Sequence, residues 1–147
     1  MTTIAYRDGI MAADSGCWAG DASHGWAEKI AKGPDGVLYG TSGRAAKCFS
    51  FLDWVRGGYQ GARPEPAATS DAESDFIVLM ATAGRGVRVL TAFGEEHYPE
   101  APYFAIGGGS VAAFGALYAG ASAQVAIEAA IEHGTSAFGR VRCITHD

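Results

Sequence analysis

The chain has 147 residues, of which 48% are hydrophobic and 18% are charged, and its formal net charge is −5 at pH 7. This length and composition are typical of one globular domain and argue against a disordered chain. The eleven Lys and Arg residues are scattered, so we expect no basic surface for a phosphate backbone and no nucleic-acid binding. A single domain is therefore expected over residues 1–147.

The cysteines indicate a reducing compartment. Cys17, Cys48 and Cys143 form no closely spaced pair, and with the four histidines they give no zinc-ligand spacing, so neither a metal nor another cofactor is expected. The uncharged stretch 101–127 contains the glycines 107–109, which would break a spanning helix, so it is interpreted as buried interior rather than membrane. Without a secretory signal at the start, the sequence predicts a cytoplasmic protein.

The first half of the chain predicts two hairpins, a helix and a loop. The expected hairpins join Thr3–Tyr6 to Ile10–Asp14 and Trp26–Lys32 to Val37–Thr41, with a looser stretch from Ser15 to Gly25 between them. Apolar residues at three- and four-residue spacing then predict a helix over 44–56, which Gly57 and Gly58 end. The stretch 59–75, with its prolines and polar residues, is expected to be an exposed loop.

The second half predicts a third hairpin, two helices and two further strands. The expected elements are strands 76–83, 87–93 and 103–106, helices 110–120 and 123–133, and a last strand 141–145. Because strands come in adjacent hairpins and helices in separate groups, this order indicates an antiparallel α+β fold. Two sheets stacked face to face with helices outside would use these elements well.

A candidate nucleophile stands directly after the initiator methionine. Thr2 is small enough for removal of Met1 to be expected. A free N-terminal threonine combines a hydroxyl that attacks carbonyls with an α-amino group of reference pKa ~7.7–8.0 that takes the proton. Many proteins begin with Met-Thr, so the argument depends on the partners of this residue.

The turn between the first two strands decides which residue faces Thr2. A three-residue turn over 7–9 places Asp14 directly opposite Thr2, which brings a carboxylate beside the terminal amine. A two-residue Asp8-Gly9 turn instead pairs Thr2 with Ser15 and turns Asp14 to the other face. We expect the first register. The alternative is that Asp14 only begins the following turn.

Lys29 and Gly40 complete the candidate site. Alternation puts Lys29 between Ala27 and Ala31, where a lysine can lie low on a sheet and act on a neighbour through its charge; the alternative is an exposed lysine. Gly40 belongs to a glycine-rich strand end before a helix, where backbone N–H groups can approach a substrate oxyanion. The alternative there is an ordinary strand-to-helix turn.

These segments together resemble the proteasome β-subunit family, most closely its bacterial HslV-type branch. The segments that carry the resemblance cover nearly the whole chain in the family's order: Thr2-Thr3-Ile4, Ala13-Asp14, Ala27-Glu28-Lys29-Ile30, the Gly-x-x-Gly stretch within 37–43, Ala105-Ile106-Gly107-Gly108-Gly109, and Cys143-Ile144-Thr145. No single motif is diagnostic, but their conjunction is fairly specific.

The resemblance implies an N-terminal-nucleophile (Ntn) hydrolase with a four-layer αββα sandwich of two antiparallel sheets. It implies a threonine endopeptidase that cleaves peptides or unfolded proteins inside a homo-oligomeric ring. In that reading Thr2 is the nucleophile and its own amine the base, Lys29 lowers the barrier to proton loss, Asp14 orients Lys29, and the Gly40 N–H binds the oxyanion. A separate ATPase unfoldase is the implied partner, because the chain has no P-loop.

Further residues are expected around this site. By position, an uncharged substrate pocket is predicted from Cys17, Ala27, Ala31, Leu38 and Ser42, with Ser110 and Thr145 in supporting roles. Among the departures of this chain from the family, two concern the site and its helical layer. The family's serine before the third helix is Gly108 here, and the loop 59–75 replaces a second long helix, so the helical layer is reduced.

Two other functions stay open at this point. One is a catalytically weak or inactive proteasome-like subunit with an assembly or binding role. The other is an Ntn amidase that acts on a small molecule.

Overall fold

The structure, a computed structural model, describes residues 2–134 and 136–147. Its strands are β1 (Thr3–Arg7), β2 (Ile10–Ala13), β3 (Cys17–Ala19), β4 (Ala22–His24), β5 (Ile30–Lys32), β6 (Leu38–Gly43), β7 (Phe76–Ala81), β8 (Val87–Thr91), β9 (Gly94–Tyr98), β10 (Tyr103–Gly107) and β11 (Arg142–Thr145). Its helices are α1 (Ala45–Arg56), α2 (Ser110–Tyr118) and α3 (Ala123–His133). The predicted α+β class is confirmed.

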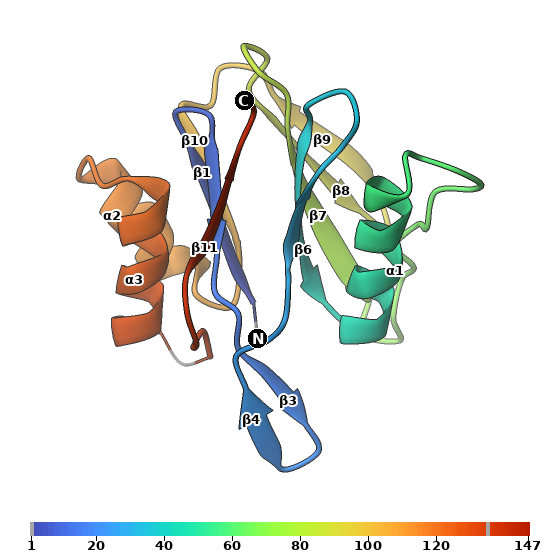
Figure 1. The fold of residues 1–147 in the computed structure, drawn as a ribbon, viewed down its shortest axis with the longest axis horizontal. Helices are drawn as coiled ribbons and strands as arrows, with labels where there is room; N and C mark the ends of the chain where they lie inside the picture. The colour runs from blue at the N-terminus through green and yellow to red at the C-terminus, as the bar shows by residue number, and fades with distance from the viewer. Residues whose placement is uncertain (1, 135) are drawn as a thin grey trace.

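The strands form two larger sheets and one small hairpin. One sheet has the order β10-β1-β2-β11 and the other the order β5-β6-β7-β8-β9, and neighbouring strands run antiparallel in both. The hairpin β3–β4 projects beyond the sheets at the end where the chain begins (Figure 1). Thr2, the first described residue, lies at this end of the sheets and lines a cavity together with Cys17 and Trp18 of the hairpin.

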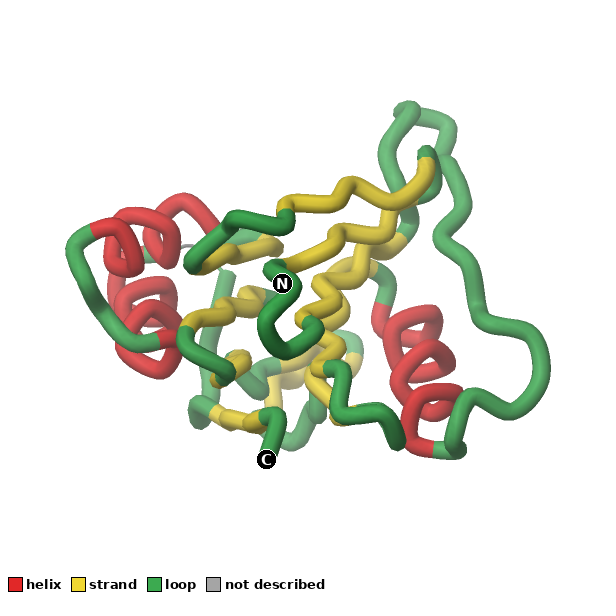
Figure 2. The backbone as a smooth tube through the Cα atoms, turned by 90° about the horizontal axis from the view of Figure 1, so that it is seen from above, coloured by secondary structure: helices red, strands yellow, loops and turns green. Residues whose placement is uncertain are grey.

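The hydrophobic core has three parts, which follow from the alternation of side chains along the strands. The inner faces of the two sheets enclose a cluster that includes Ile4, Met11, Leu38, Leu79 and Ile106. On the outer side of the first sheet, small residues such as Ala5 and Ala12 let α2 and α3 pack closely. Helix α1 covers the outer face of the second sheet (Figure 2). Each fully buried Leu, Ile or Met side chain contributes roughly 1.5–3 kcal/mol.

The first hairpin has the two-residue turn, so the expected register is wrong. Arg7 pairs with Ile10 and Ile4 with Ala13, which leaves Asp8 and Gly9 alone in the turn. Both turn residues have positive φ, 52° and 76°, as in the type I′ turns whose twist matches that of the flanking strands. An aspartate adopts this conformation more readily than most residues, which the three-residue prediction overlooked.

Two strand pairings were missed, and one strand is shorter than expected. The stretch expected to be loose contains β3 and β4, which turn at Gly20 with φ 62°. The edge strand β9 is exposed throughout and lacks the apolar alternation that marks half-buried strands. Strand β5 starts at Ile30 rather than Trp26, so Lys29 lies just before the strand.

The segment between α1 and β7 is a loop, as predicted, with one short bridge between Ala68 and Ser74. The Asp75 carboxylate ends it by accepting hydrogen bonds from the N–H groups of Ala67 and Phe76. Over residues 2–134 and 136–147, no helix is long and apolar enough to cross a membrane.

Candidate active site

A buried ion pair lies at the end of the sheets where the chain begins. Lys29 Nζ is 2.9 Å from Asp14 Oδ2, and the two side chains are 6% and 0% exposed. The carboxylate also accepts the N–H of Thr3 at 3.0 Å and that of Phe138 at 3.2 Å. Charges this deeply buried require such partners. The pair is therefore held in one geometry by three separate segments of the chain.

Asp14 reaches this position despite the unexpected register. Strand β2 ends at Ala13, so strand alternation no longer dictates the direction of the next side chain. Thr3 rather than Thr2 lies across from Asp14, and it is the Thr3 N–H that donates to the carboxylate. The predicted direct opposition of Thr2 and Asp14 is therefore replaced by a contact with the neighbouring residue.

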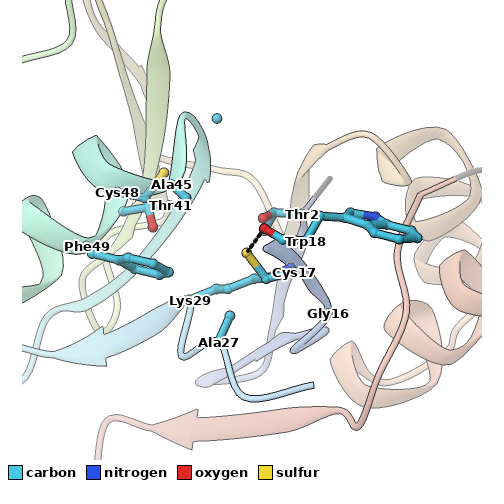
Figure 3. A pocket seen from close by; sticks show the side chains of 11 residues that line it. Thr2, Gly16, Cys17, Trp18, Ala27, Lys29, Thr41, Ala45, Cys48 and Phe49 are labelled. Carbon is cyan, nitrogen blue, oxygen red and sulfur yellow. Dashed lines mark hydrogen bonds between the residues drawn. The ribbon is translucent and has the colours of Figure 1, made fainter. Parts of the chain in front are cut away.

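Thr2 and Lys29 line one cavity of about 200 Å³ (Figure 3). Thr2 precedes β1 by one residue and, being two residues from Ile4, it lies on the side that faces the second sheet. Its carbonyl oxygen accepts the Gly108 N–H at 2.9 Å. The Thr2 residue, the buried Lys29 amine and a partly open cavity thus meet at one place. Met1, whose removal is predicted, lies outside the described residues.

The predicted substrate residues divide between this cavity and other places. Cys17 and Ala27 line the cavity. Ala31 instead packs in the cluster under α1, and Leu38 is fully buried between the sheets. Ser42 lies on the same face of β6 as Leu38, at the end of the strand, and lines a second cavity. The prediction used only the alternation of side chains along the strands. It did not take into account that α1 covers Ala31 and that the facing sheet covers Leu38.

Several lining residues were missed by sequence reasoning. They come from the β3–β4 hairpin, from the outer side of β6 and from the first turns of α1, and are Trp18, Thr41, Ala45, Cys48 and Phe49. Figure 3 shows Thr2 between the Trp18 side and the α1 side of the cavity. The apolar spacing of α1 predicted its core face correctly but gave no sign that the helix start would border a cavity. Burial raises the pKa of the Cys48 thiol, which keeps it protonated at neutral pH.

The directions of the backbone N–H groups distinguish Gly43 from Gly40. The Thr41 N–H donates to the Lys29 carbonyl at 3.0 Å, and the Arg44 N–H donates on the opposite side, toward the residue before β7. Because N–H directions alternate along a strand, the Gly40 N–H points to β7, whereas the Gly43 N–H points past the start of β5. Gly43 also lines the cavity that contains Thr2.

Gly40 has a structural reason to be a glycine. A β-carbon there would lie 2.5 Å from Ile4 Cγ2, in the interior between the two sheets. Its missing side chain lets the sheets approach each other behind the site. The prediction that Gly40 donates to an oxyanion is therefore not supported by the direction of its N–H.

The glycine turn after β10 holds the start of the chain. The Gly109 N–H donates to Thr3 Oγ1 at 2.8 Å, and a β-carbon at Gly107 would lie 1.9 Å from the Thr2 carbonyl oxygen. Ser110, predicted as a supporting residue, begins α2 and lines the second cavity. Thr145 lies opposite Ile10, at the far end of the sheet (Figure 1), and so takes no part in the site.

Within residues 2–134 and 136–147, no group of three His, Cys, Asp or Glu side chains is placed to hold a metal ion. No family model matches the sequence. No curated protein matches it. The fold is shared with solved structures of Thiobacillus denitrificans BPH, one of them in complex with epoxomicin. Both are 20% identical to this chain with a TM-score of 0.69, over 97% of this chain and 96% or 95% of the other. This likeness shows a common fold.

Proposed function

We propose that the chain is a threonine peptidase subunit of the proteasome β-subunit type, close to the HslV branch. The order of helices and sheets would then be the αββα sandwich of Ntn hydrolases, with α1 alone in one helical layer. The observation that carries the proposal is the buried ion pair of Lys29 and Asp14, whose lysine lines the same cavity as Thr2. A structural neighbour that binds epoxomicin supports it.

The first chemical step would use the N-terminal residue alone as nucleophile and base. Once Met1 is removed, the Thr2 amine takes the proton of its own hydroxyl while the oxygen attacks the substrate carbonyl. The Lys29 cation, fixed by Asp14 at 2.9 Å, stabilises the negative charge that develops on the hydroxyl oxygen. The Gly43 N–H points to where the carbonyl oxygen becomes an anion.

The remaining steps return the enzyme to its starting state. The tetrahedral intermediate breaks its C–N bond, and the leaving amine receives the proton held by the Thr2 amine. The acyl group stays on Thr2 as an ester. A water molecule then attacks this ester and gives a proton to the same amine. The ester C–O bond breaks, the amine passes that proton to the Thr2 hydroxyl oxygen, and a carboxylic acid is released.

We further propose that the subunits form a homo-oligomeric ring that receives peptides or unfolded proteins, with a separate ATPase as partner. A cytoplasmic location fits the three free cysteines, Cys17, Cys48 and Cys143. Size-exclusion chromatography with light scattering tests the assembly. A ring gives the mass of several subunits, and a monomer contradicts this part of the proposal.

A specific observation favours one alternative, a catalytically weak subunit. The residue that contacts the Thr2 carbonyl is Gly108, which offers a backbone N–H and has no hydroxyl for the terminal amine.

The small cavity of about 200 Å³ also suits the second alternative, an amidase with a compact substrate. Hydrolysis of small amides without hydrolysis of peptides would favour the amidase.

The decisive experiment compares the wild type with Thr2→Ala. Intact mass spectrometry first reports whether Met1 is absent. The wild type is then expected to hydrolyse short fluorogenic peptides and to gain the mass of an electrophilic threonine-protease inhibitor, with epoxomicin as the first probe. Thr2→Ala should lose both and keep its melting temperature.

A matched control is Thr69→Ala in the loop before β7, where the hydroxyl only accepts the Glu73 N–H. This variant should keep full activity. Equal activity in wild type and Thr2→Ala would refute the proposed nucleophile. A retained Met1 together with an inactive, correctly folded wild type would favour the weak-subunit alternative.

A further inference from the structure

A second cavity of about 550 Å³ adjoins the candidate active site. It lies between the ends of β6, β7 and β10 and the start of α2. Gly43 lines both this cavity and the smaller one that contains Thr2. The glycine whose N–H would bind the oxyanion therefore separates two spaces.

The start of the chain lies at the junction of these spaces. The Thr2 carbonyl oxygen accepts the N–H of Gly108, which lines the larger cavity. A β-carbon at Gly107 would lie 1.9 Å from this oxygen and 3.1 Å from Ser42 Oγ. The smaller cavity thus extends from Thr2 toward β5 and α1, and the larger one extends toward β10.

The two cavities differ in size and in the side chains that line them. Apolar side chains, including those of Ala27, Ala45 and Phe49, contribute to the smaller cavity. The larger cavity has more than twice the volume and carries three serines, Ser42, Ser74 and Ser110, together with the backbone of residues 105–108. Hydroxyl and peptide groups can exchange hydrogen bonds with a polar chain segment.

A carbonyl that is attacked by Thr2 has two substituents, and they must diverge. With the carbonyl oxygen at the Gly43 N–H, one substituent is directed to each cavity. The acyl residue stays attached between the two chemical steps, which suits the smaller cavity. The amine product must depart, and in a protein substrate it is a continuing chain, which suits the larger space.

We propose that the larger cavity is the leaving-group subsite, which binds the segment of a peptide on the C-terminal side of the cleaved bond. The smaller cavity holds the acyl-side residue. This assignment depends on the proposed peptidase function. It names Ser110 and Ile77 as residues that determine specificity on the leaving side.

The test uses two substrates with the same small apolar acyl side. One has a compact aminocoumarin leaving group, and the other has a leaving segment of four residues drawn from Ser, Gly and Asn. Ser110→Phe fills the larger cavity, and Val111→Phe on the same helix is the control, because Val111 is 86% exposed and does not line the cavity. The measured quantity is the kcat/KM of the extended substrate divided by that of the compact one.

We expect this ratio to fall at least tenfold in Ser110→Phe and to stay within twofold of wild type in Val111→Phe. Ile77→Phe, which fills the cavity from β7, should lower the ratio in the same direction and replaces Ser110→Phe if that variant does not fold. An unchanged ratio in an active, folded variant overturns the inference.

Failure of the proposed function has a different signature. In that case the wild type cleaves neither substrate, and the leaving-group subsite is rejected together with the peptidase. Cleavage of the compact substrate by wild type, with no effect of either filling variant on the ratio, rejects the subsite alone.

Discussion

Replacing Lys29 by methionine tests the buried ion pair directly. Methionine keeps most of the aliphatic stem but leaves the Asp14 carboxylate, which is 0% exposed, without its counter-ion. Removing one partner of a buried pair costs about 3–5 kcal/mol. Asp14 keeps the N–H groups of Thr3 and Phe138, so we expect the lower end, about 3 kcal/mol.

The loss is measured by urea unfolding followed by circular dichroism. With a slope of about 2 kcal/mol per molar urea, the midpoint should fall by about 1.5 M. The matched control is Lys47→Met, because Lys47 lies 3.8 Å from Asp75 and its side chain is half exposed. This longer pair has a half-exposed lysine, and Asp75 keeps the N–H groups of Ala67 and Phe76, so its loss should cost less than about 1 kcal/mol.

A double-mutant cycle separates the pair from its surroundings. Asp14→Asn removes the other charge, and the combination with Lys29→Met leaves no uncompensated ion in the core. The double variant should therefore lose less stability than the sum of the single variants, with a coupling of at least about 1 kcal/mol. A loss below about 1 kcal/mol in Lys29→Met, or additive losses, would refute the buried pair. Both single variants should also lose peptidase activity.

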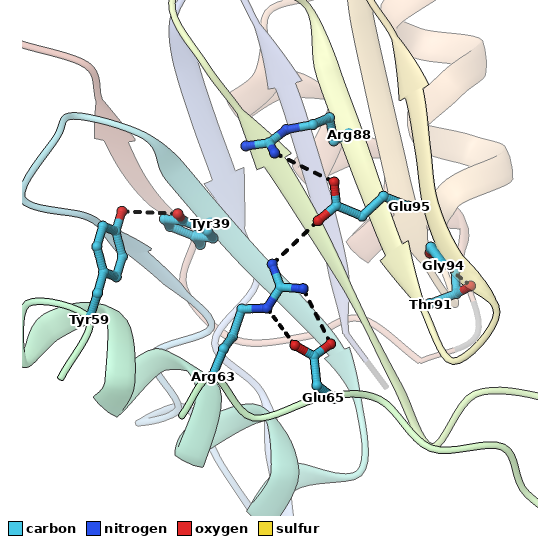
Figure 4. Close-up of polar contacts among 8 residues, drawn as sticks. All are labelled: Tyr39, Tyr59, Arg63, Glu65, Arg88, Thr91, Gly94 and Glu95. Atoms are coloured by element: carbon cyan, nitrogen blue, oxygen red, sulfur yellow. Dashed lines mark hydrogen bonds and ion pairs between the residues drawn. The ribbon is translucent and has the colours of Figure 1, made fainter. Parts of the chain in front are cut away.

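Three further predictions concern other parts of the molecule. Gly40→Ala should lower the free energy of unfolding by about 1–3 kcal/mol, because the added β-carbon would lie 2.5 Å from a side chain of β1. Gly115→Ala places its β-carbon in open space and should not destabilise the protein, so equal urea midpoints for the two variants would contradict the close approach at Gly40. Arg63→Ala removes the 3.3 Å contact with Glu95 that joins the loop to β9 (Figure 4), so a protease of broad specificity such as subtilisin should cleave the loop faster while the free energy of unfolding changes by less than about 1 kcal/mol. Burial raises the pKa of the Cys48 thiol, so iodoacetamide at neutral pH should modify it only after unfolding, and rapid modification of the native protein would contradict this.

The elements that the sequence predicted well are those with a strong apolar pattern. Helices α2 and α3 each bury one face, whereas β7 and β8 are nearly continuous apolar runs that contribute to the core on both faces of their sheet. Strand β9 could not be found in this way, because it pairs through its backbone at an edge and buries none of its side chains. Backbone pairing at an exposed edge leaves little trace in side-chain pattern.

The sequence predicted that Asp14 and Lys29 meet but did not predict how the backbone brings them together. Asp14 and Lys29 are in contact, but the register that was expected to bring the carboxylate to the terminal residue is shifted by one. The choice between Gly40 and Gly43 depends on the direction of backbone N–H groups, and only the ladder between β5 and β6 fixes that direction. A pattern of residue types contains no such information.

Contacts from the last part of the chain explain why Asp14 reaches Lys29 although the predicted register of the first hairpin is wrong. Asp14 lies beyond the end of β2 and is bound by Thr3, Lys29 and Phe138, which belong to three segments distant in sequence. The Phe138 ring occupies the space where Gly16 would carry a β-carbon, and the Gly16 N–H donates to the Phe138 carbonyl at 2.7 Å. The carboxylate is thus positioned by tertiary contacts rather than by strand pairing. A change at Gly16 would therefore act on the ion pair through Phe138.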